Sequence, residues 1–463
     1  MTSWSKEAIQ MAASERQVKE VTAEVVAALN DNPGLSKSIV YALQWLIFST
    51  GLILLVPIIL SRPLGLDHAM IASMTQRILF FSGLACLLQV VIGHRLPIVE
   101  GPSGLWWAVF IGLGTTAQAV NQDLGALRAS LQMAMIVAGV TVAIIGATGL
   151  VGKAMKYFTP VVTGSVLVLL TLQLAGGFIR GALGVGYRGA PISATATVIS
   201  VAVVLAVVLV SLKASPLARS LAVLIGVAIG WLAFLALGDV NLAVLKDARL
   251  FGAPGVFAWG APTWDAGVVL TGVIAALILI PNVVASMIAM TRAAGAGDVP
   301  QQSFSRGVLF NGVANILAGV GSTVGSISYA TAAGLVSITG VAARLPFVIF
   351  SVILIAMGFI PAIGAALATI PPPVGNAVFI AAMCTLFGFG VKDYARLKFT
   401  NREMFVLGIS VMVGVGIMFL PADALAAVPR WLSYLLGNGM ITGMLVCLLL
   451  EHVLLREDFF KSK

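Results

Sequence analysis

The chain reads EGPSG at residues 100–104 and GSISYATAAG at residues 325–334, two stretches of small and polar residues at the start of apolar segments. Non-helical backbone at membrane depth must line a cavity or pack inside protein, because unpaired peptide groups in lipid cost several kcal/mol. Glycine and serine also let a ligand or a second backbone approach closely. We therefore interpret the two stretches as the interrupted parts of two membrane spans that enclose one binding site.

The composition of the chain is that of an integral membrane protein. Of its 463 residues, 59% are hydrophobic and only 10% are charged, whereas soluble domains carry about 25% charged residues. A spanning helix needs about 20 apolar residues, and an interrupted helix can be shorter. The sequence predicts an all-α polytopic protein with fourteen such segments, near residues 39–60, 77–92, 101–120, 127–150, 158–183, 194–212, 217–237, 267–290, 307–322, 326–343, 345–367, 374–391, 403–420 and 435–455.

The distribution of positive charge predicts the orientation of these segments. An even number places both termini on one side, and with the N-terminus inside, most of the 27 lysines and arginines fall in inside loops and tails. We expect an inner (plasma) membrane protein with a cytosolic segment 1–38, helical over 5–29, and a cytosolic tail 456–463. The net charge of +9 is then an orientation signal, and we expect no nucleic-acid partner.

The longest outside loop, 239–266, divides the chain into two sets of seven segments, 39–238 and 267–455. Because seven is odd, the second set begins on the opposite side of the membrane, which is the topology of an inverted repeat. The two interrupted segments are the third of each set. Paired interruptions at matching positions of two repeats indicate a binding site near the bilayer midplane.

Four motifs in order give the chain a resemblance to a known family. They are YALQW at 41–45 with LVP at 55–57, GHRLPIVEGPS at 93–103, YFTPVVTGSV at 157–166 and IPPPVG at 370–375. In this order and spacing they resemble motifs of the nucleobase–ascorbate transporter family, which includes the xanthine and uracil permeases. In the window of the tenth-helix signature, Gly334, Thr339 and Gly340 fit the family pattern, whereas Thr331 and Ala332 do not.

The resemblance implies a core domain, a gate domain and short antiparallel strands in segments 3 and 10 that flank the substrate. Position by position, it implies a gate-domain homodimer and these substrate-binding residues: Gln44, Ser103, Gly104, Asn282, Tyr329, Ala330 and Thr331. Asn282 and Thr331 occupy positions where relatives carry acidic or amide side chains, and Trp45 replaces the usual histidine beside Gln44. Each residue also has a structural interpretation as helix-packing contact or interhelical hydrogen bond.

The usual acidic positions are empty, since no Asp or Glu occurs between Ala266 and Gly297 or between Gly307 and Ala343. Asn282 and Thr331 can form hydrogen bonds but cannot bind a proton. Glu100, next to the first interruption, is a candidate replacement that carries the coupling ion. The alternative is an interfacial residue paired with Arg95 or His94.

These features predict a secondary active transporter of a uracil- or xanthine-class nucleobase, a symporter coupled to protons, or else to sodium, that works by alternating access. The alternative is a carrier of another small organic or inorganic anion on the same fold. The absence of the usual carboxylates favours it, because a carboxylate would repel an anionic substrate. We expect no enzyme, cofactor or metal, because the segments contain neither a His-Asp pair nor a His-His-Glu cluster.

Overall fold

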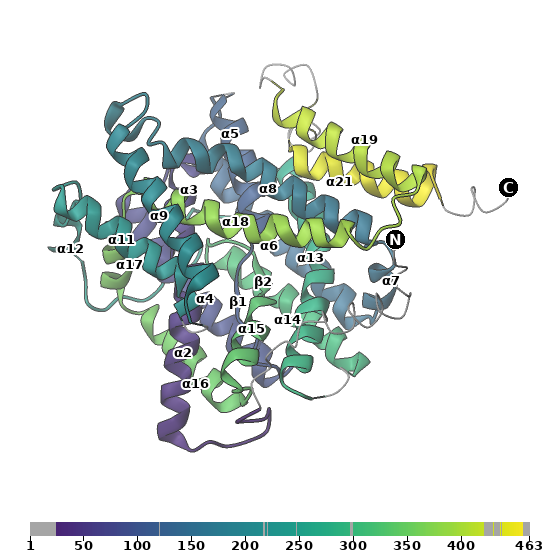
Figure 1. Cartoon of the computed structure of the whole chain (residues 1–463), viewed down its shortest axis with the longest axis horizontal. Helices are drawn as coiled ribbons and strands as arrows, with labels where there is room; N and C mark the ends of the chain where they lie inside the picture. The colour runs from purple at the N-terminus through teal and green to yellow at the C-terminus, as the bar shows by residue number, and fades with distance from the viewer. Residues whose placement is uncertain are drawn as a thin grey trace, which may run out of the picture.

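The computed structural model describes residues 25–119, 121–215, 218–219, 221–246, 248–296, 300–420, 429, 436 and 438–456. Helices make up most of these residues, and two three-residue strands lie at the centre of the molecule (Figure 1). Within the described residues, seven helices are long and apolar enough to cross a membrane, and one bent pair raises that number to as many as eight. The prediction of a mostly helical protein with many apolar spans is confirmed.

Before the long loop, the described elements are α2 (Leu35–Ile53), α3 (Val56–Leu64), α4 (His68–Val91), β1 (Glu100–Pro102), α5 (Gly104–Ala119), α6 (Leu124–Ala147), α7 (Val151–Met155), α8 (Pro160–Ala182), η1 (Tyr187–Gly189), α9 (Ala194–Lys213) and α11 (Ala222–Ala236). The loop contains α12 (Ala243–Lys246). After it come α13 (Ala266–Ala293), α14 (Gln301–Val320), β2 (Ser326–Ser328), α15 (Thr331–Thr339), α16 (Arg344–Met357), α17 (Pro361–Ala368), α18 (Pro372–Tyr394), α19 (Asn401–Met418), α21 (Gly439–Leu449) and η3 (Leu450–Leu454).

Several helices begin where a capping side chain satisfies the free N–H groups of the first turn. Asp67 caps α4, Thr159 caps α8 ahead of Pro160, and Thr400 with Glu403 forms a capping box on α19. Asp123 accepts hydrogen bonds from the backbone N–H groups of Gly125 and Ala126, which hold the pKa of this exposed carboxyl below its ordinary value. These caps fix the points at which loops give way to spans.

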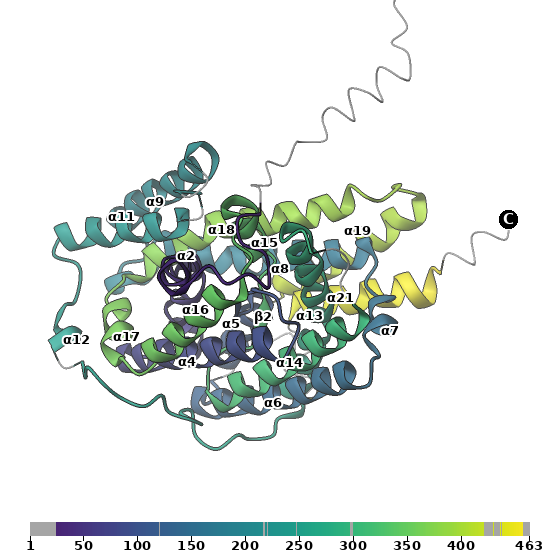
Figure 2. The ribbon, with the colours of Figure 1, turned by 90° about the horizontal axis from the view of Figure 1, so that it is seen from below.

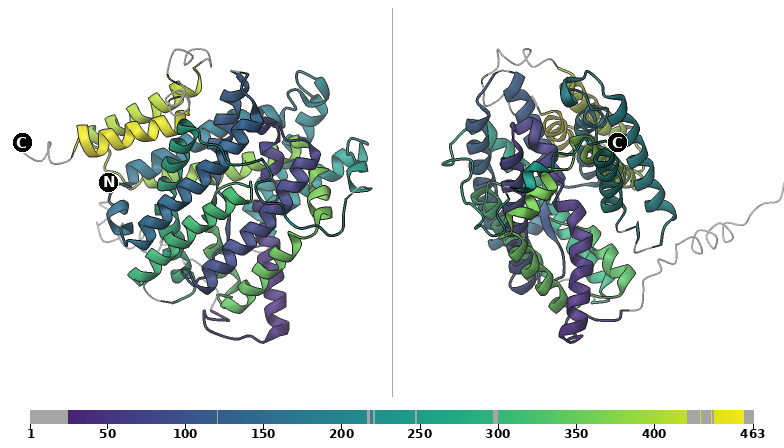
Figure 3. Two further views of the ribbon diagram at one scale, coloured as in Figure 1. Left: turned by 180° about the vertical axis from the view of Figure 1, so that it is seen from behind. Right: turned by 90° about the vertical axis from the view of Figure 1, so that its left-hand side faces the viewer.

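The helices pack as two groups. The strand group surrounds β1 and β2 and consists of α2 to α7 and α13 to α17, whereas the flanking group consists of α8, α9, α11, α18, α19 and α21. Figure 2 shows α9, α11, α18 and α19 in one layer and α4, α6 and α14 in another, and the right-hand view of Figure 3 shows the layers from the side. Trp107 on α5 contacts Phe379 on α18 at a ring-centroid distance of 4.9 Å, so aromatic packing joins the two groups.

Two details differ from the expectations. The segment 345–367 is not one straight span, because α16 and α17 are bent by 79° at a break that Pro361 follows; proline cannot continue a helix through its own position. Most of the helix predicted over 5–29 lies outside the described residues, but residues 25–29 are not helical. There Ala27 forms a parallel bridge with Val341, and Arg344 donates to Asn30 Oδ1 and to the carbonyl of Arg95.

Glycines bring α6 and α14 into backbone contact. A Cβ atom at Gly139 would lie 2.6 Å from the carbonyl oxygen of Gly312, and one at Gly312 would collide with the backbone nitrogen of Ala143. Gly146 and Gly319 meet the partner helix in the same way. Small residues that permit such close approach drive helix association in membranes, where the hydrophobic effect contributes little.

We predict that Gly312→Ala lowers the apparent thermal unfolding midpoint of the purified protein in detergent, because overpacking costs about 1–3 kcal/mol. The matched control is Gly408→Ala on α19, where a Cβ atom meets nothing within 4 Å, so the midpoint should stay or rise. Equal midpoints for the two variants would contradict the role of glycine at this helix contact.

Candidate functional site

The two short strands form an antiparallel pair in the middle of the strand group. Glu100 lies opposite Ser328, Gly101 opposite Ile327 and Pro102 opposite Ser326. Two more backbone hydrogen bonds extend the pairing at its ends: Ser103 N–H donates to the carbonyl of Gly325, and Tyr329 N–H donates to that of Val99, both at 2.9 Å. The interruptions in the two apolar segments are therefore paired with each other.

A helix begins directly after each strand. α5 begins at Gly104 and α15 begins at Thr331, so the first turns of two helices meet the strand pair. The first N–H groups of a helix have no partner within the helix, and the helix dipole places partial positive charge there. Several of these N–H groups have local partners, since Ala332 and Ala333 donate to the carbonyls of Tyr329 and Ala330 and Leu105 donates to the Ser103 hydroxyl. The arrangement therefore offers a polar ligand mainly the partial positive charge of two helix N-termini.

Two asparagines of α14 pair with the backbone of β2. Asn315 Nδ2 donates to the carbonyl oxygen of Ser326, and Asn315 Oδ1 accepts from the Ser326 N–H, both at 3.1 Å. Asn311 Nδ2 lies 3.4 Å from the same carbonyl oxygen. Buried peptide groups must be paired, and these amides supply partners that a third strand would otherwise provide.

Glu100 is fully buried beneath the strands. Its Oε1 accepts a hydrogen bond from the Ser328 hydroxyl, and its Oε2 accepts from Asn311 Nδ2 at 3.2 Å. His94 Nε2 lies 3.7 Å from Oε1, and both of these side chains are inaccessible to solvent. Among the ion pairs of the described residues, none joins Arg95 to Glu100. Glu100 therefore faces His94 in the protein interior, and its role in coupling stays a prediction.

The exposed polar residues of this region lie on α13 and at the start of α15. Asn282, Ala330 and Thr331 are exposed, although α13 and α15 lie inside the strand group. Ser286 Oγ lies 3.1 Å from Asn282 Oδ1 and 2.9 Å from the carbonyl oxygen of Ser328. Asn282 is thus joined to β2 through Ser286.

The other predicted site residues are placed as follows. Ser103 is buried and its hydroxyl accepts from the Leu105 N–H, Gly104 is half-buried, and the hydroxyl of half-buried Tyr329 donates to the carbonyl of Pro102 at 3.0 Å. Gln44 is half-buried on α2, which packs against β1. The structure brings six of the seven predicted residues to the strand pair or the neighbouring face of α13, and Gln44 to an adjacent helix.

Sequence reasoning missed Ser286, Asn311, Asn315 and Ser328. A signal was present: Asn311 and Asn315 are four residues apart in an otherwise apolar segment, and a polar side chain buried in a span needs a polar partner. The pair could have been recognised as partners for the backbone of an interrupted neighbour.

Aromatic residues near the strands are packing residues. Trp106 is fully buried, and a Cβ atom at Gly325 would collide with its indole ring. Trp45 is also buried and contacts Phe347 edge-on at 5.0 Å between ring centroids. Neither ring is available to stack on a ligand in this conformation.

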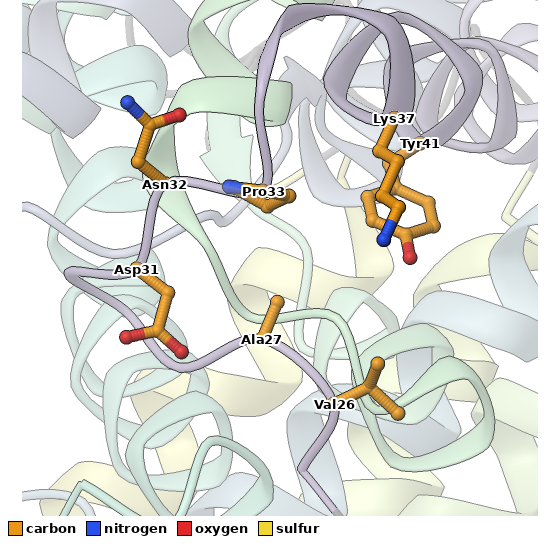
Figure 4. A pocket seen from close by; sticks show the side chains of 7 residues that line it. All are labelled: Val26, Ala27, Asp31, Asn32, Pro33, Lys37 and Tyr41. Atoms are coloured by element: carbon orange, nitrogen blue, oxygen red, sulfur yellow. The ribbon is translucent and has the colours of Figure 1, made fainter.

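A separate hollow lies beside α2, away from the predicted site residues. Figure 4 shows Lys37 and Tyr41 of α2 next to one another, with the lining residues Val26 to Pro33 along the chain segment that precedes the helix. Among the residues that the structure describes, no group of three or more His, Cys, Asp and Glu could hold a metal ion. The strand pair and its surroundings, where six of the seven predicted residues lie, are the candidate functional site.

Comparison with known proteins identifies the family. A sequence model described as "Permease family" (Xan_ur_permease) matches residues 36–423. The chain belongs to the xanthine/uracil permease family. This permease is 30% identical to "Putative purine permease YwdJ" of Bacillus subtilis over 418 residues, 89% of this chain and 94% of that protein. It is 25% identical to the "Xanthine permease" of the same organism, over 91% of this chain and 94% of that protein.

A solved structure supports the architecture of the permease. The transmembrane domain of the cyanobacterial bicarbonate transporter BicA matches with a TM-score of 0.58 at 12% identity, over 90% of this chain and 98% of that one. At this identity the likeness concerns the fold alone. The permease is thus an integral multi-pass membrane protein with a known transporter fold.

We predict that Asn315→Ala destabilises the permease, because it leaves the buried N–H of Ser326 without its partner and weakens the pairing of its carbonyl. An unpaired buried polar group costs about 1–3 kcal/mol, so the thermal midpoint in detergent should fall. The matched control is Asn376→Ala: this side chain is half-buried, and its amide makes a solvent-exposed hydrogen bond to the carbonyl of Pro372 within the same helix. Loss of stability in the control alone would exclude a role for Asn315 in holding β2.

Proposed function

We propose that this permease is a secondary active transporter of a nucleobase of the uracil or xanthine class. The observation that carries the proposal is the paired interruption of two spans, which places exposed Asn282, Ala330 and Thr331 beside two helix N-termini in a chain of the xanthine/uracil permease family. Polar groups that are held in place by a strand pair can bind the edge of a small planar solute.

The chemistry of the site matches the edge of a nucleobase. Uracil and xanthine present alternating C=O and N–H groups, and a side-chain amide such as Asn282 offers both donors and an acceptor. The Thr331 hydroxyl can donate to a base carbonyl or accept from a base N–H. No titratable group is needed among these direct contacts.

The transport cycle that we propose is alternating access across fourteen spans in a seven-plus-seven inverted repeat. The strand group corresponds to the core domain and the flanking group to the gate domain. The base moves with the strand group relative to the flanking group, and the aromatic contact between Trp107 and Phe379 lies at the boundary between them. Coupling to a proton supplies the driving force.

The substrate proposal predicts the outcome of uptake measurements in proteoliposomes. Labelled xanthine, uric acid and uracil are tested in counterflow, each with competing unlabelled nucleobases, nucleosides, sulfate, benzoate and bicarbonate. We expect counterflow of at least one nucleobase and competition from other bases only. Imposed pH and sodium gradients then identify the coupling ion. A protein that ignores all nucleobases would disprove this proposal.

One observation favours a second candidate, a carrier of a small anion. The exposed site residues on α13 and α15 include no carboxylate, and helix N-termini stabilise negative charge. A structural neighbour is described as a bicarbonate transporter. Competition by sulfate, benzoate or bicarbonate without competition by any base would select this candidate.

The orientation proposal places both termini in the cytosol and the loop 239–266 outside the inner membrane. Alkaline phosphatase, which is active only outside the cytosol, should be inactive when fused after residue 463 and active when inserted in the loop. A fluorescent protein that matures only in the cytosol should give the reverse pattern. Activity of the C-terminal phosphatase fusion would require an odd number of spans or an inverted orientation.

A further inference from the structure

The buried carboxyl of Glu100 has polar partners but no cation bound to it. Ser328 and Asn311 donate to its two oxygens. No lysine or arginine forms an ion pair with Glu100 among the described residues, including Lys37, Arg292 and Arg306 on the neighbouring α2, α13 and α14. A carboxylate that is buried without a cationic partner carries a large desolvation cost.

The hydrogen bond at Nδ1 of His94 indicates which ring nitrogen carries the hydrogen. The Leu96 N–H donates to His94 Nδ1 at 3.0 Å, so Nδ1 has no hydrogen and the ring is neutral with its proton on Nε2. That nitrogen points toward Glu100 Oε1 at 3.7 Å and has no other partner among the described residues. His94 therefore faces the carboxyl as a neutral donor rather than as a fixed positive charge.

Among the described residues, the other titratable groups close to Glu100 are the Cys86 thiol of α4 and the Tyr329 phenol. Cys86 Sγ accepts from the Glu100 backbone N–H at 3.1 Å, and the Tyr329 hydroxyl donates to the carbonyl of Pro102 on the same strand. Neither group supplies positive charge. Binding of one proton to the Glu100 carboxylate gives a neutral carboxyl and removes the buried charge of this cluster.

Protonation of Glu100 changes the hydrogen bond to Ser328. An ionised carboxylate only accepts, so the Ser328 hydroxyl must donate to it; a neutral carboxyl has its own O–H, which can donate to Ser328 Oγ. The Ser328 hydrogen is then free to turn to another acceptor. The direction of the hydrogen bond between Ser328 and Glu100 thus depends on whether Glu100 is protonated.

The same residue reaches the exposed site. The Ser328 carbonyl accepts from Ser286, and Ser286 Oγ also lies 3.1 Å from Asn282 Oδ1. The single hydroxyl hydrogen of Ser286 serves one of these acceptors at a time. Through Ser286, the backbone of Ser328 is thus connected to Asn282, whose side chain is exposed.

Building on the proposed nucleobase transport, we propose that Glu100 carries the coupling proton and that Ser328 and Ser286 transmit its protonation state to Asn282. In each cycle the carboxylate takes one proton from the outside, stays neutral while the loaded site changes its exposure, and releases the proton to the cytosol. The buried carboxyl of β1 takes over the coupling role that no acid in α13 or α15 can fill.

The test compares wild type, Glu100→Gln, Glu100→Asp and the control Asp393→Asn in proteoliposomes with labelled xanthine, uric acid and uracil. Gln has one donor and one acceptor group and resembles the neutral carboxyl. Glu100→Gln should keep base counterflow but lose accumulation under an inside-alkaline pH gradient, so that internal and external concentrations become equal. An internal pH dye should register base-dependent proton influx for wild type and none for Glu100→Gln.

The control and the second variant keep the proposal falsifiable. Asp393 lies on α18 in the flanking group, where it accepts a hydrogen bond from Thr163 on α8. It does not contact Glu100, so the Asp393→Asn variant should accumulate base as wild type does. Glu100→Asp keeps a titratable group and should stay coupled, with a shifted pH profile of uptake, which decides the matter if Glu100→Gln does not fold. Gradient-driven accumulation by Glu100→Gln, or a pH profile of Glu100→Asp identical to wild type, would overturn the proposal. Absence of counterflow of every base in wild type would instead reject the nucleobase function, and this inference with it.

Discussion

The hydrogen bonding between β1 and β2 is the constraint on which the central part of the molecule depends. Two apolar segments leave the helical conformation in the interior, and each exposes peptide groups that lipid cannot satisfy. Pairing the two interruptions satisfies both, and Asn311 and Asn315 bind the outer edge of β2. Everything that faces the candidate site, including the starts of α5 and α15, takes its position from this pair.

The electrostatic character of the site follows from that geometry. The exposed polar side chains near the strand pair, Asn282 and Thr331, are neutral, whereas the carboxyl group of Glu100 on β1 is fully buried. Glu100 and Asn282 do not touch, yet both reach Ser328, one through its hydroxyl and the other through Ser286 and the carbonyl. Because the two side chains do not touch, a substitution at Asn282 need not change the surroundings of the Glu100 carboxyl group.

Much of the helical architecture was predictable, because apolar runs and the bias of positive charge follow from the bilayer itself. The interruptions were predictable too, since glycine, serine and proline cluster at residues 100–104 and 325–334. The partners were not: Asn311 and Asn315 belong to a different segment, and only the packing of α14 beside β2 brings their amides to the strand. Likewise, the sequence places Glu100 beside His94 and Arg95 without indicating which of them its side chain meets. The bend between α16 and α17 had a visible cause in Pro361, which the apolar pattern around it obscured.

The pairing of β1 with β2 also has a consequence for biosynthesis. Strand β1 leaves the ribosome well before β2 has been translated. The bridge between Ala27 and Val341 joins residues that are even further apart in sequence. Contacts between residues so distant in sequence close late. During this interval the backbone of residues 100–102 has no strand partner, so it must stay near water or within the insertion machinery until residues 326–328 have been translated. The part of the permease before the 239–266 loop therefore lacks the strand that pairs with β1.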